Sequence, residues 1–323
     1  MIRLGTFPTP VQRIDALSRE GKSLWVKHDD LTNATYGGNK VRKLERILED
    51  ARGAKRIVTV GAVGSHHVLA TAIFAREIGV PVEAVLVPQP TTPHVIENLR
   101  ADLGLGVEVL PARSYPHAAA RLVTRVARGA YYIPVGGSNL LGALAYVDAA
   151  RELAEQIRAG ELPEPDAVVV TLGSGGTAGG LAAGLALEGL GSRLVAVTVS
   201  DPAVLVARSA RSLARAAARH EAKRLGRAVP KIRMEIDARY LGPGYGQETE
   251  AGRRALAIAK DVGLALDLTY TAKTFAAALD LLEGGGVRNL LYWHTLSSAP
   301  MQPWLDHAPT ETELSPAMRA LLR

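Results

Sequence analysis

The sequence predicts an α/β protein with two parallel-sheet domains. Short runs rich in valine, leucine and isoleucine alternate with stretches of helical character along most of the 323 residues, as at 82–87, 167–171 and 289–293. This alternation is typical of βαβ units, whose strands form parallel sheets. Parallel sheets place their ligands beyond the carboxyl ends of the strands. Functional residues are therefore expected where strands end.

The expected elements follow in chain order. A buried strand over 55–60 precedes a helix over 65–78, for which Ser65 is a good N-cap. A helix over 94–103 is expected to end at Gly104, because glycine readily adopts the left-handed conformation after a helix. The other expected strands lie at 82–87, 107–110, 131–135, 167–171, 194–199, 233–236 and 289–293, and a further helix lies at 139–158.

The chain length suits two medium domains that share one chain. We expect a large domain of residues 1–45 plus 151–323 and a small inserted α/β domain of residues 46–150. The Pro/Glu-rich segment 160–165 is the best candidate boundary, and we interpret it as a short crossover rather than a flexible linker.

Composition excludes several classes of protein. The chain has no cysteine, which excludes disulfides, thiolate metal sites and cysteine nucleophiles. Adjacent His66 and His67 would point to different helix faces, so no metal site is predicted. No apolar run reaches membrane-spanning length and the N-terminus lacks the apolar core of a secretory signal, so we expect no membrane partner and a cytoplasmic location.

The formal net charge of +6 would permit nucleic-acid binding. However, the main basic cluster, within residues 208–233, has arginines at helical spacing. This spacing is typical of the solvated face of an amphipathic helix. No nucleic-acid partner is therefore expected.

The segment Gly37-Gly38-Asn39-Lys40 carries the first candidate for chemistry. Asn39 is a good N-cap, and Lys40 would lie on the first turn of the helix behind it. The positive potential there, next to Arg42 and Lys43, lowers a lysine pKa and raises the neutral fraction that Schiff-base chemistry needs. A solvent-exposed helix start after a glycine turn is the alternative, and spacing alone favours it.

A glycine-rich loop, Gly173-Ser174-Gly175-Gly176-Thr177, follows a strand and opens a helix. Its backbone N–H groups and the helix dipole favour an anion, most often a phosphate. A turn needed for close helix–strand packing is the alternative. The glycine spacing also fits a loose dinucleotide fingerprint, but Asp201 lies farther from the loop than the roughly 20 residues that this fingerprint requires.

Other candidates lie in turns or at strand ends. Ser65 could face a bound carboxylate, although an N-cap role is the simpler interpretation. Tyr245 and Tyr270 also lie in a turn or at a strand end. The simplest interpretation is that both are core aromatic residues whose hydroxyl groups are hydrogen-bonded. Thr295 follows His294 at the end of a strand, which by itself indicates no function.

Taken together and in their order along the chain, these motifs resemble those of the family of D-cysteine desulfhydrases and 1-aminocyclopropane-1-carboxylate deaminases. These are pyridoxal-phosphate enzymes with the tryptophan synthase β-subunit-like fold, which is fold type II. The resemblance runs nearly end to end and rests on the full set of segments rather than on one motif. The segments are 27–45, the strand loop with Ser65, 135–139, the glycine loop, 242–246, the Tyr270 segment and His294-Thr295.

The resemblance implies which residues hold pyridoxal 5′-phosphate. Lys40 would attach the cofactor covalently and move the substrate proton. Lys43 and the loop of Gly173, Ser174, Gly175, Gly176 and Thr177 would bind the phosphate. Thr295 would hydrogen-bond the pyridine nitrogen and leave it largely unprotonated, which suits elimination more than transamination. His66 occupies the position of an asparagine that meets the ring oxygen in the family.

The resemblance also implies a small amino-acid substrate and a homodimer. Ser65 would face the substrate carboxylate or touch the Lys40 amine, and Tyr245 and Tyr270 would line the cofactor and substrate pocket, where one of them could lie against the ring face. Thr271 and Thr295 stand where similar deaminases carry glutamate and leucine. This difference favours a lyase that catalyses α,β-elimination, or deamination, of a D-cysteine-like amino acid to a 2-oxo acid and ammonia.

Several alternatives stay open. They are a 1-aminocyclopropane-1-carboxylate deaminase, an amino-acid racemase or β-replacement enzyme on the same fold, and a cofactor-binding homologue with reduced catalysis. The last gains support from His66 and Leu296, which depart from the family pattern and predict a changed cofactor tilt or a specialised substrate. A dinucleotide-binding oxidoreductase would leave Lys40 without a role.

Overall fold

The computed structural model describes residues 2–322 and confirms the α/β class, with two mostly parallel sheets. Its contacts divide the chain into two compact units. One comprises Met1–Leu4, Leu44–Gly137 and Ala299–Arg323, and the other comprises Gly5–Lys43 and Ser138–Ser298. The predicted domains, 1–45 plus 151–323 and 46–150, have different bounds and stay a prediction.

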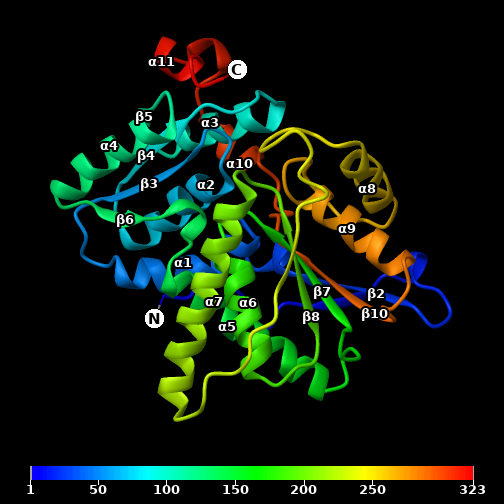
Figure 1. Cartoon of the computed structure of the whole chain (residues 1–323). Helices are drawn as coiled ribbons and strands as arrows, with labels where there is room; N and C mark the ends of the chain where they lie inside the picture. The colour runs from blue at the N-terminus through cyan, green and yellow to red at the C-terminus, as the bar shows by residue number, and fades with distance from the viewer. Residues whose placement is uncertain (1, 323) are drawn as a thin grey trace. The chain divides into compact units, whose positions relative to one another are not determined.

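The larger unit contains a six-stranded sheet in the order β1-β2-β10-β7-β8-β9. Only β1 runs antiparallel to its neighbour. Figure 1 shows the blue β2 beside the orange β10, although they lie far apart in the sequence. The strands are β1 (Val11–Arg13), β2 (Ser23–His28), β7 (Ala167–Leu172), β8 (Arg193–Thr198), β9 (Glu235–Asp237) and β10 (Asn289–His294).

Helices cover both faces of this sheet, which explains why the central strand β7 is almost continuously apolar and is buried along its whole length. Val168, Val170 and Leu172 pack with one group of helices, whereas Ala167 and Val169 pack with the other. The first group is α5 (Leu140–Arg158), α6 (Gly176–Leu187) and α7 (Ala203–Leu225), and the second is α8 (Glu250–Asp261) and α9 (Thr271–Glu283), as Figure 1 shows.

The smaller unit contains a four-stranded parallel sheet in the order β5-β4-β3-β6. The boundary between the two units falls within helix α1 (Asn39–Asp50). Its residues up to Lys43 belong to the larger unit, and those from Leu44 onward belong to the smaller one. The strands are β3 (Ile57–Ala62), β4 (Val82–Val87), β5 (Glu108–Pro111) and β6 (Tyr131–Ile133), and the helices are α2 (His66–Ala75), α3 (Pro93–Gly104), α4 (Tyr115–Ala127), α10 (Gln302–Leu305) and α11 (Pro316–Arg319).

The expected end of the helix over 94–103 was wrong in detail. Gly104 is the last residue of α3, and Gly106 is the residue with a left-handed φ of 78°. The backbone N–H of Val107 donates to the carbonyl oxygen of Asp102, which closes the turn two residues later than expected. Gly104 instead gives room to the backbone of Ala308, which a Cβ would approach to 2.9 Å.

The arginine-rich helix is confirmed as an amphipathic surface helix. Helix α7 buries Ala207, Ala210 and Ala214, whereas Arg208 and Arg211 are exposed. The positively charged face is therefore solvated, as its spacing predicts.

No helix within residues 2–322 combines the length and the apolar composition that crossing a membrane would require.

Asp102 is a buried carboxyl group in α3, and it generates a prediction about stability. Among the described residues, neither of its carboxylate oxygens has a hydrogen-bond partner, and burial raises its pKa well above the usual range. Because the folded state binds this proton more tightly than the unfolded state, the charge costs stability as pH rises above about 4. Asp102→Asn should therefore raise the free energy of unfolding at pH 8 and reduce its fall with rising pH.

Urea unfolding between pH 4 and pH 8 measures both quantities. Asp261→Asn, at an exposed position of α8, is the matched control and should change neither. A variant Asp102→Asn that is less stable than the parent at pH 8 would contradict the assignment of an unpaired carboxyl group.

Candidate active site

Lys40 lies in the first turn of α1, and Asn39 connects it to the glycine loop. The Nζ of Lys40 donates a hydrogen bond to the Oδ1 of Asn39 at 2.6 Å, and the Nδ2 of Asn39 donates to the Oγ1 of Thr177 at 3.0 Å. Asn39 is thus the first residue of the helix, with its side chain engaged in this link rather than in the expected N-cap. Burial lowers the pKa of Lys40 to about 8, although the carboxylate of Asp267 opposes this. Lys40 is therefore neutral more often near pH 7 than an exposed lysine.

Two glycines allow the segment before Lys40 to pass close to the loop that follows β10. The backbone N–H of Asn39 donates to the carbonyl oxygen of Thr295 at 3.0 Å, and that of Gly37 donates to the Oγ of Ser297 at 2.9 Å. Gly38 has a φ of 89°, and a Cβ there would lie 2.8 Å from the Thr295 oxygen. Both features require glycine. The fold therefore brings Thr295 beside the start of α1.

The glycine-rich loop lies between β7 and α6. Gly175 has a φ of 105°, and a Cβ there would lie 2.8 Å from the backbone nitrogen of Ala210. The N–H of Gly176 donates to the Oγ of Ser138 at 2.9 Å, and this Oγ shares a 2.7 Å hydrogen bond with that of Ser174. The loop is therefore packed closely, as one interpretation expected, and it also gathers serine hydroxyls at a helix N-terminus, which suits a phosphate.

Lys43 brings a second amino group to the same place. A Cβ on Gly176 would lie 3.3 Å from the Nζ of Lys43, so this amino group borders the loop. Burial lowers the pKa of Lys43 well below its usual range, and the charge of Lys40 lowers it further. Two neighbouring lysines, the serine hydroxyls and the start of α6 form a donor set that fits a phosphate dianion.

Tyr245 and Tyr270 meet through their hydroxyl groups, which share a hydrogen bond. Their rings are 5.8 Å apart and inclined at 68°. The N–H of Tyr245 donates to Asp201 at 2.8 Å, and that of Tyr270 donates to Asp267 at 2.8 Å. The Oγ1 of Thr271 also donates to Asp267, at 2.6 Å. The Thr271 hydroxyl is therefore engaged at the start of α9, a role that the sequence did not indicate.

His294 is the last residue of β10, and neither of its ring nitrogens has a hydrogen-bond partner within residues 2–322. Thr295 follows it and is buried. The ring of His294 stacks on that of Tyr292 at 5.8 Å and 27°. Burial lowers the pKa of His294, so its ring is neutral near pH 7.

Ser65 and His66 belong to the smaller unit. Ser65 directly precedes α2, as predicted, but its hydroxyl makes no capping hydrogen bond to that helix. The ring of His66 lies 4.4 Å from that of His94, whereas the Nε2 of His67 lies 3.0 Å from the Oγ1 of Thr59. The two histidines thus point to different faces, as expected.

Within the larger unit, the structure brings together Lys40, Lys43, the loop 173–177 and Thr295. Asp267 links the tyrosine pair to this group, because its carboxylate acts on Lys40 and binds the backbone of Tyr270. Sequence reasoning missed Ser138 and Asp267 as members of this group. Ser138 follows two glycines and precedes a helix, which is a signal that could have been used. Asp267 stands four residues before Thr271 and carries no comparable signal.

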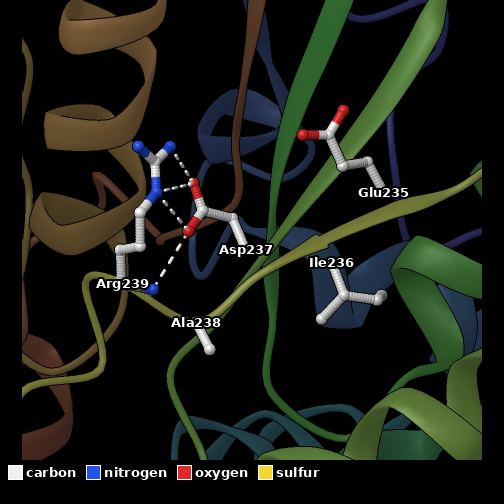
Figure 2. Close-up of a pocket in the computed structure, with 5 residues that line it drawn as sticks. All are labelled: Glu235, Ile236, Asp237, Ala238 and Arg239. Atoms are coloured by element: carbon white, nitrogen blue, oxygen red, sulfur yellow. Dashed lines mark hydrogen bonds and ion pairs between the residues drawn. The ribbon is translucent and has the colours of Figure 1, made fainter.

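A separate open hollow of about 600 Å³ lies along β9 and is lined by residues 235–239. Figure 2 shows that Asp237 and Arg239 point toward one another there. Their closest contact is 2.6 Å, so the charges of the two side chains are mutually paired. None of the predicted site residues lines this hollow, and we do not interpret it as the active site.

Comparisons with known proteins agree with the donor set. A family model described as "Pyridoxal-phosphate dependent enzyme" matches residues 2–291. The chain is 34% identical over 312 residues to a protein of Pyrococcus furiosus named "Putative 1-aminocyclopropane-1-carboxylate deaminase", with 91% of each chain covered. It is 37% identical over 287 residues to the D-cysteine desulfhydrase of Salmonella choleraesuis, covering 84% of this chain and 85% of that protein.

Among solved structures, an "ACC deaminase homologue" superposes with a TM-score of 0.79 at 31% identity, covering 95% of each chain. These matches confirm fold type II, the pyridoxal 5′-phosphate cofactor and the resemblance that the motifs indicated. The chain belongs to the family of pyridoxal-phosphate dependent enzymes.

Proposed function

We propose that this enzyme catalyses α,β-elimination of a small, D-cysteine-like amino acid. One observation carries the proposal, together with the named relatives. Lys40, with its pKa of about 8, is joined through Asn39 to Thr177 of the glycine loop, which Lys43 borders. This arrangement supports a role for Lys40 as a base beside a phosphate-binding loop.

Each candidate residue then has a proposed role. Bound pyridoxal phosphate supplies an electron sink for the carbanion at the substrate Cα. Lys40 attaches the cofactor and takes the Cα proton at its Nζ. Lys43 and residues 173–177 hold the phosphate, and the Thr295 hydroxyl meets the pyridine nitrogen.

The remaining residues act on the substrate. Tyr245 and Tyr270 line its pocket, Ser65 faces its carboxylate, and His66 meets the ring oxygen. Loss of the Cα proton and of the Cβ leaving group gives an amino acrylate, which takes up water and releases ammonia. For D-cysteine and one water, the products are pyruvate, ammonia and hydrogen sulfide.

The deaminase is the second candidate function, because two of the matched proteins carry that name. A cytoplasmic location and a homodimer also belong to the proposal. The resemblance supports the homodimer, and light scattering of the purified protein tests it.

The first prediction concerns Lys40. Lys40→Ala should abolish the visible absorbance of lysine-bound cofactor and its fixation by borohydride, because no other residue attaches the cofactor. The exposed Lys55→Ala is the control. Lys27 is a poor control, because its buried ammonium pairs with Glu152 at 2.5 Å. A borohydride-fixed adduct at full stoichiometry in Lys40→Ala would overturn the assignment.

The second prediction concerns the glycine loop. Gly175 cannot be tested cleanly, because a side chain there would meet Ala210. Gly173 can, since the nearest atom to a Cβ is 3.9 Å away. Gly173→Asp should weaken cofactor binding sharply, because like charges repel in a partly desolvated site. Asparagine has the shape of aspartate without its charge, so Gly173→Asn should bind the cofactor much more tightly than Gly173→Asp. Equal dissociation constants for the two folded variants would show that the loop is only a packing turn.

The third prediction concerns the substrate. D-cysteine and β-chloroalanine should yield pyruvate faster than 1-aminocyclopropane-1-carboxylate is deaminated. Thr295→Val should slow elimination about threefold to tenfold, as expected for one hydrogen bond of about 0.5–1.5 kcal/mol. A 2-oxo acid assay with both enantiomers of cysteine, serine and chloroalanine measures these rates. Turnover of the cyclopropane substrate alone would favour the deaminase.

A further inference from the structure

Lys273 is a buried lysine of α9 for which the proposed mechanism has no use. Its side chain is fully buried, and its Nζ donates a hydrogen bond to the backbone carbonyl oxygen of Leu241 at 2.8 Å. Its stem packs beside α8, where a Cβ on Gly252 would lie 3.7 Å from the Lys273 Cγ. Burial lowers the pKa of Lys273, and the carboxylates of Asp201 and Asp267 oppose that effect. A buried ammonium group is costly unless it is paired, so this position requires a reason.

The two carboxylates that attract Lys273 each hold one of the paired tyrosines. Asp201 accepts the backbone N–H of Tyr245 at 2.8 Å. A Cβ on Gly244 would lie 2.8 Å from the same carboxylate oxygen, so the residue before Tyr245 must be small for Asp201 to approach. Asp201 therefore fixes the end of the loop that carries Tyr245.

Asp267 fixes the other tyrosine in the same way. It accepts the N–H of Tyr270 at 2.8 Å, the N–H of Thr271 at 3.0 Å and the hydroxyl of Thr271 at 2.6 Å. These contacts fix the start of α9. Tyr270 lies three residues before Lys273 in the sequence. One cation thus lies in the field of both anchoring carboxylates and also bonds directly to the loop of residues 240–246.

We propose that Lys273 is the positioning residue that sets the Tyr245–Tyr270 pair on the substrate side of the site. The ammonium group ties the loop of residues 240–246 to α9 through Leu241, and it balances the charges of Asp201 and Asp267. The two tyrosine hydroxyls, which come from different elements, then meet. The functional part of this proposal rests on the proposed role of the two tyrosines with substrate.

This role is separate from cofactor binding. The cofactor is assigned to the start of α1, the loop after β7 and Thr295, whereas Lys273 acts on the loop of residues 240–246. Removal of the ammonium group should therefore displace Tyr245 and impair substrate handling while the covalent attachment through Lys40 persists.

The experiment compares Lys273→Met with the exposed control Lys260→Met. Methionine retains the apolar stem and removes the charge. In the cofactor-free protein, hydrogen–deuterium exchange of the peptide covering residues 240–247 should become faster in Lys273→Met alone, because the Leu241 contact is lost. In the loaded enzyme, the cofactor absorbance and dissociation constant should stay at parent values, while kcat/KM for D-cysteine falls about tenfold.

A double-mutant cycle with Tyr245→Phe separates positioning from general destabilisation. If Lys273 acts through Tyr245, Lys273→Met should reduce kcat/KM little further once the tyrosine hydroxyl is gone. Multiplicative losses would overturn the proposal. Lys273→Arg, which retains a cation and a donor, should restore part of the parent activity.

The exchange measurement keeps this test independent of the proposed function. Unchanged exchange of residues 240–247 in Lys273→Met overturns the proposal, whatever substrate the enzyme uses. Faster exchange with no turnover of any amino acid by the parent supports the structural role and rejects the proposed function. If Lys273→Met does not fold, Asp201→Asn should give the same local exchange increase, and unchanged exchange there overturns the proposal.

Discussion

The buried carboxylate of Asp29 is the interaction on which the start of α1 depends. It accepts hydrogen bonds from the Nε of Arg42 at 2.9 Å, the hydroxyl of Tyr146 at 2.6 Å and the indole of Trp293 at 2.8 Å. These partners come from α1, α5 and β10. Its backbone oxygen also accepts the N–H of Gly38 at 2.8 Å. A fully buried charge is stable only when such partners surround it. Because Asp29 binds both Gly38 and Arg42, which flank Lys40 in the sequence, it fixes the position of Lys40.

Much of this architecture could be predicted because it depends on local pattern. The strand over 82–87 has the predicted bounds. The long-range partners could not be predicted. Lys27 looks like an ordinary lysine in the sequence, yet it lies with Arg42 around Glu152, which is 125 residues away from Lys27 along the chain. No local periodicity encodes a contact of that separation.

The hydrogen-bond partners of Thr271 and Ser138 were not predicted either. The role of Thr271 as a determinant of substrate class stays a prediction, and the structure adds that its hydroxyl donates to Asp267. Ser138 lies just before α5 and received no role, yet its hydroxyl accepts the Gly176 N–H. Thr271 bonds four residues back along the chain, whereas Ser138 bonds to a residue 38 positions away. A motif therefore indicated the region of the site more reliably than the partner of each hydroxyl.

In the proposed mechanism the two lysines make opposite demands on the site, which a bound phosphate would reconcile. Lys40 must be neutral to act as a nucleophile and base, whereas Lys43 is most useful as a cation. With both near each other and buried, each pKa is lowered. A phosphate dianion held by the glycine loop would raise the pKa of Lys43 most, because Lys43 borders that loop. Cofactor binding would then take up a proton at Lys43, so the affinity should fall as pH rises above the pKa of Lys43 in the free enzyme.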